Sequence, residues 1–446
     1  MAKIKPSTTT KTCIAAPVTS PGLTWEWLHT PASSSAGSSS HEQPRATSSL
    51  PFVNSVKQNL RELFLPVGYP DNLHPCYKNF HMWLALETYV GSCIGVLCSQ
   101  AMLASLGLGT VEATSGAVIK YILKDGIGEV GKLFFIKSFA SSFDSHPKTW
   151  KFVCEILSSV GSFLQLCTSI APTKMFLPLA SVGNAFELVH ESVWIASHMT
   201  FTKQFSPNGN IGDIVAKDDA QMSTAHLLGM LSGVGLIAVC DSPTFLFTMF
   251  AILSPINIWS TYKMIQVSKF EILNQAKVTL LTRGFIDRGY VENYDGLADK
   301  EIGFGEWIRP GKGNIHYKIR MGASADEAFR STEEISNAIH LLCGERYLLN
   351  FDKAKNTMFI LYHDNAEAND YMKSILHANK MYDLVSSQHI AKDTHWEAYW
   401  QTMADAHDWT NSHFDAFIKS LDDHQWQRET VYWNDTGKRV TWDQPT

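Results

Sequence analysis

Long uncharged apolar runs dominate the first two thirds of the chain. Residues 220–240 and 242–262 form two such runs, and only Asp241, Ser242 and Pro243 interrupt them. Each run has about 20 residues, which is the length that an α-helix needs to cross the hydrocarbon core of a bilayer. The pattern predicts two membrane helices joined by a tight turn. A pair of buried helices in a large soluble domain is the alternative.

Similar apolar runs precede this pair. They predict helices over residues 88–111, 119–139, 150–171 and 175–199. Two GxxxG motifs, at Gly91 and Gly95 and at Gly229 and Gly233, provide the small residues that let helices approach closely. We therefore expect a mainly α protein with a multi-helix, membrane-associated domain over residues 51–285.

The segment before this domain has a different character. Ser, Thr, Pro and Ala dominate residues 1–50, so we predict a disordered tail that cannot bury a core. The tail has no apolar segment of the kind that a secretory signal requires. Residues 1–25 contain three Lys and no acidic residue, as in an organellar transit peptide, although they lack Arg. A plain disordered tail is the alternative.

Beyond residue 290 the pattern becomes that of a small α+β domain. Residues 315–321 alternate as a strand, and residues 346–363 predict a β-hairpin. Amphipathic helices are expected on either side of the hairpin, which gives an α+β domain over residues 290–390. A charged helix over residues 391–422 follows it.

The last residues resemble part of a WW domain. Residues 431–445 are similar to its second and third strands, so a WW-like β-hairpin is expected over residues 424–446. The resemblance implies that Trp442 would contact a proline-rich peptide. The position of the groove tyrosine holds Val431, and a truncated, structural hairpin is the alternative.

Charge is distributed unevenly along the chain. The net charge is -6, and no basic face dominates, which argues against a nucleic-acid partner. No Arg lies between Arg61 and Arg283, whereas the last third is densely charged. This change marks a boundary near residues 266–290. The eight cysteines form no CxxC pair, so we expect reduced thiols and no metal site.

Ionisable residues within the apolar region are the candidate functional residues, because burying charge in a membrane is costly. They are Glu87, Lys120, Lys124, Asp125, Glu187, Glu191, Lys217, Asp218 and Asp241. Two Lys-Asp pairs, each ahead of an apolar stretch, stand out among them. At a helix start such a pair could bind an anionic small molecule, or it could simply cap the helix. The two pairs could also mark a duplicated unit.

No catalytic signature accompanies these residues. The sequence has no P-loop, no nucleotide-binding glycine pattern, no GxSxG and no HExxH. We therefore predict a protein that is not an enzyme, with no catalytic residues and no cofactor. A soluble helical enzyme is a third alternative, which requires that the purified chain dissolve without detergent.

Three motifs stand out by their order and spacing. They are Pro66, Gly68, Tyr69 and Pro70, then Lys124, Asp125 and Gly126, then Lys217 and Asp218. In these motifs the chain resembles the ROOT UVB SENSITIVE family, over about residues 55–390. The chain departs from the family pattern at Asp219, where a glycine is common.

The resemblance implies a helical, membrane-associated protein that handles a small molecule linked to vitamin B6 homeostasis or to the ultraviolet-B response. It also implies a membrane location, in a plastid or another organelle, and a second family member as a partner. The alternative is a membrane-anchored scaffold that recruits partners through its C-terminal α+β and WW-like regions.

Overall fold

The computed structural model describes residues 51–107, 115–206, 209–298, 300–303, 317–389 and 396–442. The predicted disordered tail over residues 1–50 lies outside them. Long helices make up the first part: α1 (Pro51–Phe64), α2 (Tyr77–Ser105), α3 (Ser115–Phe139), α4 (Pro147–Cys167), α5 (Phe176–Phe205), α6 (Ile211–Val239) and α7 (Pro243–Val267). Short 3-10 helices, η1 (Ala140–Ser142) and η2 (Thr173–Met175), precede α4 and α5. The predicted mainly α fold is confirmed.

The turn between α6 and α7 falls where the two apolar runs are interrupted. Cys240 ends α6 in an extended conformation, and Ser242 caps α7 by accepting a hydrogen bond from the Phe245 N–H at 3.4 Å. Pro243 occupies the first turn of α7, where its missing N–H has no intrahelical partner to lose. The hydrophobic pattern therefore located α7, the turn and the end of α6, whereas α6 begins at Ile211, before its apolar run.

The start of α2 was predicted too late. The uncharged run begins at residue 88, but the helix begins at Tyr77 and carries Glu87 inside it. Glu87 is only 7% exposed and pairs with Lys151 of α4. A charge with a buried partner does not end a helix, so the limits of the uncharged run were a poor guide here.

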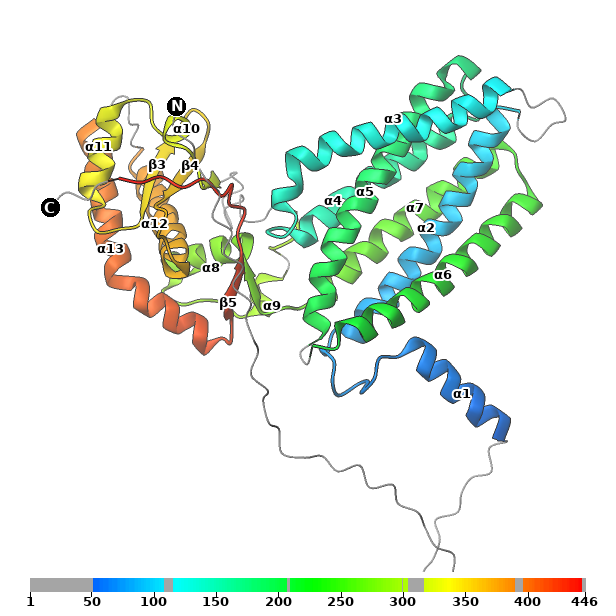
Figure 1. Ribbon diagram of the computed structural model, residues 1–446, viewed down its shortest axis with the longest axis horizontal. Helices are drawn as coiled ribbons and strands as arrows, with labels where there is room; N and C mark the ends of the chain where they lie inside the picture. The colour runs from blue at the N-terminus through cyan, green and yellow to red at the C-terminus, as the bar shows by residue number, and fades with distance from the viewer. Residues whose placement is uncertain are drawn as a thin grey trace, which may run out of the picture. The chain divides into compact units, whose positions relative to one another are not determined.

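The long helices pack as two neighbouring groups (Figure 1). In one group α5 packs between α3 and α4, and in the other α2 packs between α6 and α7. Contacts of α4 with α7 and with α2 join the groups. Helices α2, α6 and α7 are long and apolar enough to cross a membrane.

Small residues set the closest helix contacts. A Cβ added at Gly229 would lie 2.3 Å from the Tyr89 carbonyl oxygen, and one at Gly233 would lie 2.8 Å from the Val96 Cβ. The second GxxxG motif therefore holds α6 against α2. The first motif does not act this way, because a Cβ at Gly95 would meet nothing within 4 Å.

The chain after α7 forms an α+β region around a three-stranded sheet. Its elements are β1 (Ile272–Asn274), α8 (Gln275–Arg288), α9 (Tyr294–Leu297), β2 (Lys318–Met321), α10 (Ala325–Ala328), α11 (Thr332–Leu341), β3 (Tyr347–Asp352), β4 (Thr357–Tyr362), α12 (Ala368–Ser387), α13 (Trp396–Asp423) and β5 (Gln427–Tyr432). The sheet order is β2-β4-β3, with β2 parallel and β3 antiparallel to β4. The predicted β3–β4 hairpin is confirmed, and α12 packs on β3 and α8.

The predicted WW-like hairpin over residues 424–446 is wrong within the described part of that range, which ends at residue 442. Strand β5 pairs in parallel with β1 instead of folding back on the residues that follow it. Two single bridges, Met321 with Asp435 and His363 with Val440, attach the remaining residues to the ends of β2 and β4. Because strands earlier in the chain offer unpaired edges, the last segment satisfies its backbone groups there.

Candidate functional site

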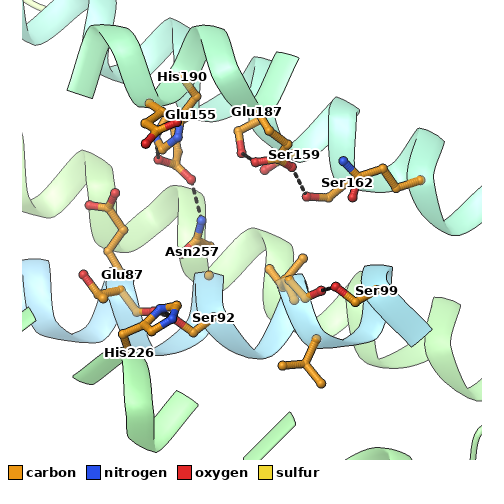
Figure 2. Close-up of a pocket in the computed structure, with 18 of the residues that line it drawn as sticks. Glu87, Ser92, Ser99, Glu155, Ser159, Ser162, Glu187, His190, His226 and Asn257 are labelled. Carbon is orange, nitrogen blue, oxygen red and sulfur yellow. Dashed lines mark hydrogen bonds and ion pairs between the residues drawn. The ribbon is translucent and has the colours of Figure 1, made fainter. Parts of the chain in front are cut away.

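A polar cavity of about 750 Å³ lies inside the helical body (Figure 2). Side chains from α2, α3, α4, α5, α6 and α7 all line it. Among them are the polar groups Glu87, Ser92, Lys124, Glu155, Ser158, Ser162, Asn184, Glu187, His190, Glu191, His226 and Asn257. A cavity with so many polar groups, in a body built from apolar helices, is the strongest candidate for a ligand site.

Beside the cavity, the ammonium of Lys151 binds two carboxylates from different helices. Lys151 is fully buried on α4; its Nζ lies 2.5 Å from Glu87 Oε1 and 2.9 Å from Glu155 Oε2. His190 of α5 completes the cluster, with its Nε2 3.0 Å from Glu155 Oε2. Asn257 of α7 donates a further hydrogen bond to Glu155. The cluster thus joins four helices through ion pairs and hydrogen bonds.

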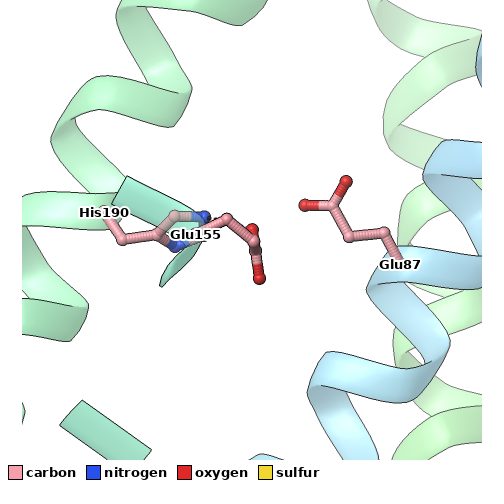
Figure 3. Close-up of side chains that lie close together, drawn as sticks. All are labelled: Glu87, Glu155 and His190. Atoms are coloured by element: carbon pink, nitrogen blue, oxygen red, sulfur yellow. Dashed lines mark ion pairs between the residues drawn. The ribbon is translucent and has the colours of Figure 1, made fainter. Parts of the chain in front are cut away.

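Ligand atoms of Glu87, Glu155 and His190 lie within 4.8 Å of one another, a spacing that could hold a metal ion (Figure 3). The ammonium of Lys151 lies within 3.0 Å of an atom of each of these side chains. It therefore supplies the positive charge that a metal ion would bring. In this structure the lysine ammonium takes the place that a metal ion would have among these three side chains.

Two buried oxygen atoms at the cavity have no hydrogen-bond partner among the described residues. They are Glu87 Oε2 and Asn257 Oδ1, and each of these residues is only 7% exposed. Leaving a buried acceptor unpaired costs about 1–3 kcal/mol, so such atoms indicate where a donor binds. Both oxygens can accept hydrogen bonds, and neither can donate one in its ionised or amide form.

Glu187 on α5 offers a further acidic group. Its two oxygens accept hydrogen bonds from Ser158 at 2.9 Å and from Ser162 at 2.6 Å. On α6, the ring of His226 lies 2.7 Å from the hydroxyl of Ser92. The cavity therefore presents carboxylate, hydroxyl and imidazole groups to a bound molecule.

Sequence reasoning identified Glu87, Glu187 and Glu191, but it missed Lys151, Glu155 and His190. Lys151 and Glu155 stand four residues apart on α4, the spacing at which opposite charges on a helix face meet. That spacing, inside an apolar helix, is the signal that could have found them. The contact with Glu87 had no such signal, because 64 residues separate the two partners.

The first predicted Lys-Asp pair does not stand at a helix start. Lys124 and Asp125 lie in the middle of α3, which begins at Ser115, so the unpaired N–H groups of a helix terminus are not available to them. Lys124 is buried at the cavity and lies 2.6 Å from the Asp125 carboxylate. Gly126 has open space around it. The pair neutralises its own charge.

The second pair is also inside a helix, but its two residues have different surroundings. Lys217 donates a hydrogen bond to the carbonyl of Glu62 in α1. Asp218 is buried between two imidazoles: it accepts a hydrogen bond from His198, and its Oδ1 lies 3.1 Å from the Nε2 of His81. Neither Lys217 nor Asp218 lines the cavity.

The Pro66, Gly68, Tyr69 and Pro70 motif connects α1 to α2 and contacts the start of α6. The N–H of Val67 donates to Asp213 of α6 at 2.7 Å. Gly68 has a positive φ of 81°, which a side chain would strain, and Tyr69-Pro70 is a cis bond. The first and third motifs therefore meet at one end of the helical body, whereas Lys124 of the second motif lies at the cavity.

Trp442, the predicted peptide contact, packs within the protein. Its ring meets that of His363 edge-on, with centroids 4.8 Å apart. The neighbouring Trp433 stacks on Tyr371, with centroids 6.0 Å apart. These contacts attach the last segment to the end of β4 and to α12. The structure therefore gives Trp442 a packing role.

A second buried charge cluster connects the helical body to the region after it. Glu301 lies 3.0 Å from the Nζ of Lys148 and 3.6 Å from the Nζ of Lys277. Burial lowers the pKa of Lys277 to about 8, because a charged ammonium is costly away from water. This cluster lies outside the cavity lining, and it contributes to structure.

The fold and the site define a class: a multi-helix protein with helices able to cross a membrane and a polar cavity among them. The sequence profile of the vitamin B6 photo-protection and homoeostasis domain matches residues 53–289. That of the root UVB sensitive protein C-terminal region matches residues 312–442. The chain belongs to the root UVB sensitive family.

Curated relatives agree with this assignment. The chain is 28% identical to protein root UVB sensitive 6 of Arabidopsis thaliana over 333 residues. These aligned residues make up 74% of this chain and 64% of that relative. It is 25% identical over 394 residues to protein root UVB sensitive 2, chloroplastic, of the same plant, covering 88% of this chain and 87% of the relative. No solved structure matches the chain.

Proposed function

We propose that the helical body is embedded in a membrane and that its cavity binds a small polar molecule linked to vitamin B6 homeostasis. The cavity of about 750 Å³, lined by six helices, carries this proposal. Three of those helices, α2, α6 and α7, are long and apolar enough to cross a bilayer. The proposal assigns no chemical reaction to the site.

The charges of the lining favour a ligand with positive charge or with several donors. Glu87, Glu155, Glu187 and Glu191 contribute four carboxylates. The ammonium of Lys151 contacts two of them, Glu87 and Glu155, and the ammonium of Lys124 is paired with Asp125. Uncompensated negative charge is costly in a site of low dielectric constant, so a protonated amine is favoured over a phosphate ester.

Pyridoxamine, which has a primary amine, is therefore a better fit than pyridoxal 5′-phosphate. Its ammonium would donate to Glu87 Oε2 and Asn257 Oδ1, the acceptors that lack partners among the described residues. Charge-assisted hydrogen bonds of this kind are about twice as strong as neutral ones. An anionic phosphorylated vitamer, one example of the anionic ligands considered for the Lys-Asp pairs, would face the carboxylates instead.

The test is a binding titration of the full-length protein in detergent micelles. We expect pyridoxamine to bind more tightly than pyridoxine, and pyridoxal 5′-phosphate to bind weakest. Glu87→Gln should weaken pyridoxamine binding about tenfold, the effect of losing about 1.4 kcal/mol of charge-assisted bonding. The matched control is Glu129→Gln on α3, whose partner is Lys132 and which does not line the cavity. Tightest binding of the phosphate ester would refute the proposal.

The proposed location is an organellar membrane. The three helices able to span a bilayer support the membrane, and the chloroplastic relative supports a plastid. Resistance of the protein to carbonate extraction from isolated organelles tests this directly. Release into the soluble fraction would favour the soluble alternative.

A further inference from the structure

The six long helices of the body divide into two sets of three with matching contacts. The first set is α2, α3 and α4, and the second is α5, α6 and α7. Helix α2 packs on α6 and α7, and its counterpart α5 packs on α3 and α4. The third helices of the sets, α4 and α7, pack on each other. Exchanging the two sets therefore reproduces these contacts; among the described residues, the contact of α2 with α4 has no equally close counterpart between α5 and α7.

The two sets run in opposite directions. The start of α2 lies beside the end of α5, where the Phe80 ring meets that of Phe205 at 4.9 Å. The end of α2 lies beside the start of α5, where Met102 packs with Phe176. An odd number of helices in each set produces this inversion, because successive helices reverse direction.

The third helices show the same inversion. Phe152 near the start of α4 contacts Tyr262 near the end of α7, with ring centroids 6.0 Å apart. Phe163 near the end of α4 contacts Phe247 near the start of α7, at 5.9 Å. The helices α4 and α7 are thus antiparallel neighbours, as expected for counterparts across a twofold axis.

Glycines occupy corresponding helix contacts in the two sets. On α6, Gly229 faces α2, where an added Cβ would lie 2.3 Å from the Tyr89 oxygen. On α3, Gly128 faces α5, where an added Cβ would lie 2.5 Å from the Asn184 Nδ2. The second helix of each set is thus held tightly against the first helix of the other.

Sequence features follow the same correspondence. Each Lys-Asp pair, at Lys124 and at Lys217, falls on the second helix of its set. Each third helix, α4 and α7, begins with a proline. An Asp-Ser pair comes directly before Pro243, and another comes before Pro147 with His146 between the pair and the proline. Glu87 is the eleventh residue of α2, and Glu187 is the twelfth of α5.

We propose that the helical body is a membrane carrier built from two inverted three-helix repeats, α2–α4 and α5–α7. The inference rests on the proposed function, since it requires that the helices be embedded and that the cavity bind a ligand. Both repeats line the cavity, and Asn257 of α7 hydrogen-bonds Glu155 of α4 across the repeat interface.

Inverted repeats explain how one site can serve both sides of a membrane. When one repeat rocks against the other, each adopts the conformation that its counterpart had, and the access route changes sides. The pair of Glu155 on α4 with His190 on α5 lies at this interface. The contact of Lys151 with Glu87 joins α4 to α2 within the first repeat. The carrier therefore exposes its cavity alternately to the two sides.

Cysteine accessibility in sealed proteoliposomes tests this without a known ligand. Ser99 and Met222 both line the cavity. Ser99 lies near the end of α2, whereas Met222 packs with residues at the start of α2. A membrane-impermeant thiol reagent is applied from each side to Ser99→Cys and to Met222→Cys, and labelling above that of the native chain is measured. Leu231→Cys, 61% exposed on α6 and outside the cavity, is the control.

We expect both cavity cysteines to react from either side, because the cavity opens alternately to each side, and the control to react from neither. Labelling of the cavity cysteines from one side only, or from neither side, would overturn the carrier. A second measurement uses the unaltered protein, so it does not depend on how the variants fold. Preloading the vesicles with unlabelled pyridoxamine should accelerate uptake of labelled pyridoxamine severalfold. Binding without such exchange refutes the carrier alone, whereas absence of binding also refutes the proposed function.

Discussion

Replacing Lys151 by methionine removes the positive charge from the cluster beside the cavity while keeping an unbranched apolar side chain. The lysine is fully buried, and Glu87 and Glu155 both depend on its ammonium. In the variant the two carboxylates remain buried, with His190 as the remaining titratable neighbour of Glu155. We expect a large loss of stability, because unpaired buried charge is costly.

The magnitude follows from the cost of breaking a buried ion pair. Removing one partner of such a pair typically costs about 3–5 kcal/mol. For a domain of this size, each kcal/mol lowers the melting temperature by about 2–4 °C. The apparent melting temperature of Lys151→Met in detergent should therefore fall by about 10 °C. Thermal unfolding followed by tryptophan fluorescence measures it.

A second substitution identifies the cause. Adding Glu87→Gln to Lys151→Met removes one of the stranded carboxylates and should recover roughly half of the loss. The matched control adds Glu187→Gln instead, since Glu187 binds Ser158 and Ser162 and is not among the partners of Lys151. Equal recovery by both substitutions, or a fall below about 3 °C for Lys151→Met alone, would refute this account of the cluster.

Three further predictions concern other parts of the chain. Burial lowers the pKa of His377 to about 3, so below about pH 6.5 the unfolded chain binds a proton that the folded chain does not. The free energy of unfolding should therefore fall by about 1.4 kcal/mol for each pH unit below about pH 6.5. In chemical denaturation, His377→Asn should remove about 2 kcal/mol of the loss between about pH 7.5 and pH 5. Gly229→Ala should destabilise the protein by about 1–3 kcal/mol, because the added Cβ meets Tyr89. The control Gly235→Ala should not destabilise it, because the space around Gly235 is open. Thermal unfolding of both variants in detergent compares them. A titration of the full-length protein with a polyproline peptide should give no binding heat, because Trp442 is packed on the sheet; saturable heat would restore the peptide-binding role.

The amino-acid pattern determined the helices and the family of this protein. Apolar runs of membrane-spanning length located α6 and α7, and Asp241, Ser242 and Pro243 located the turn between them, because a break in hydrophobicity and a proline act locally. The acids Glu87 and Glu187 stood out for a similar reason, since an isolated charge in or beside an apolar run is visible without any contact.

The tertiary structure alone decided which of these residues meet. Lys151 and Glu87 are 64 residues apart, and Asn257 and Glu155 are 102 residues apart, so no local spacing could pair them. The same limit misplaced the last segment: residues 424–446 have the pattern of a hairpin, but β5 pairs with β1, more than 150 residues earlier in the chain. Side-chain periodicity reports the local backbone, whereas partners are chosen by packing and by which polar groups remain unsatisfied. The cavity, its acidic lining and the inverted repeats are therefore properties of the folded chain.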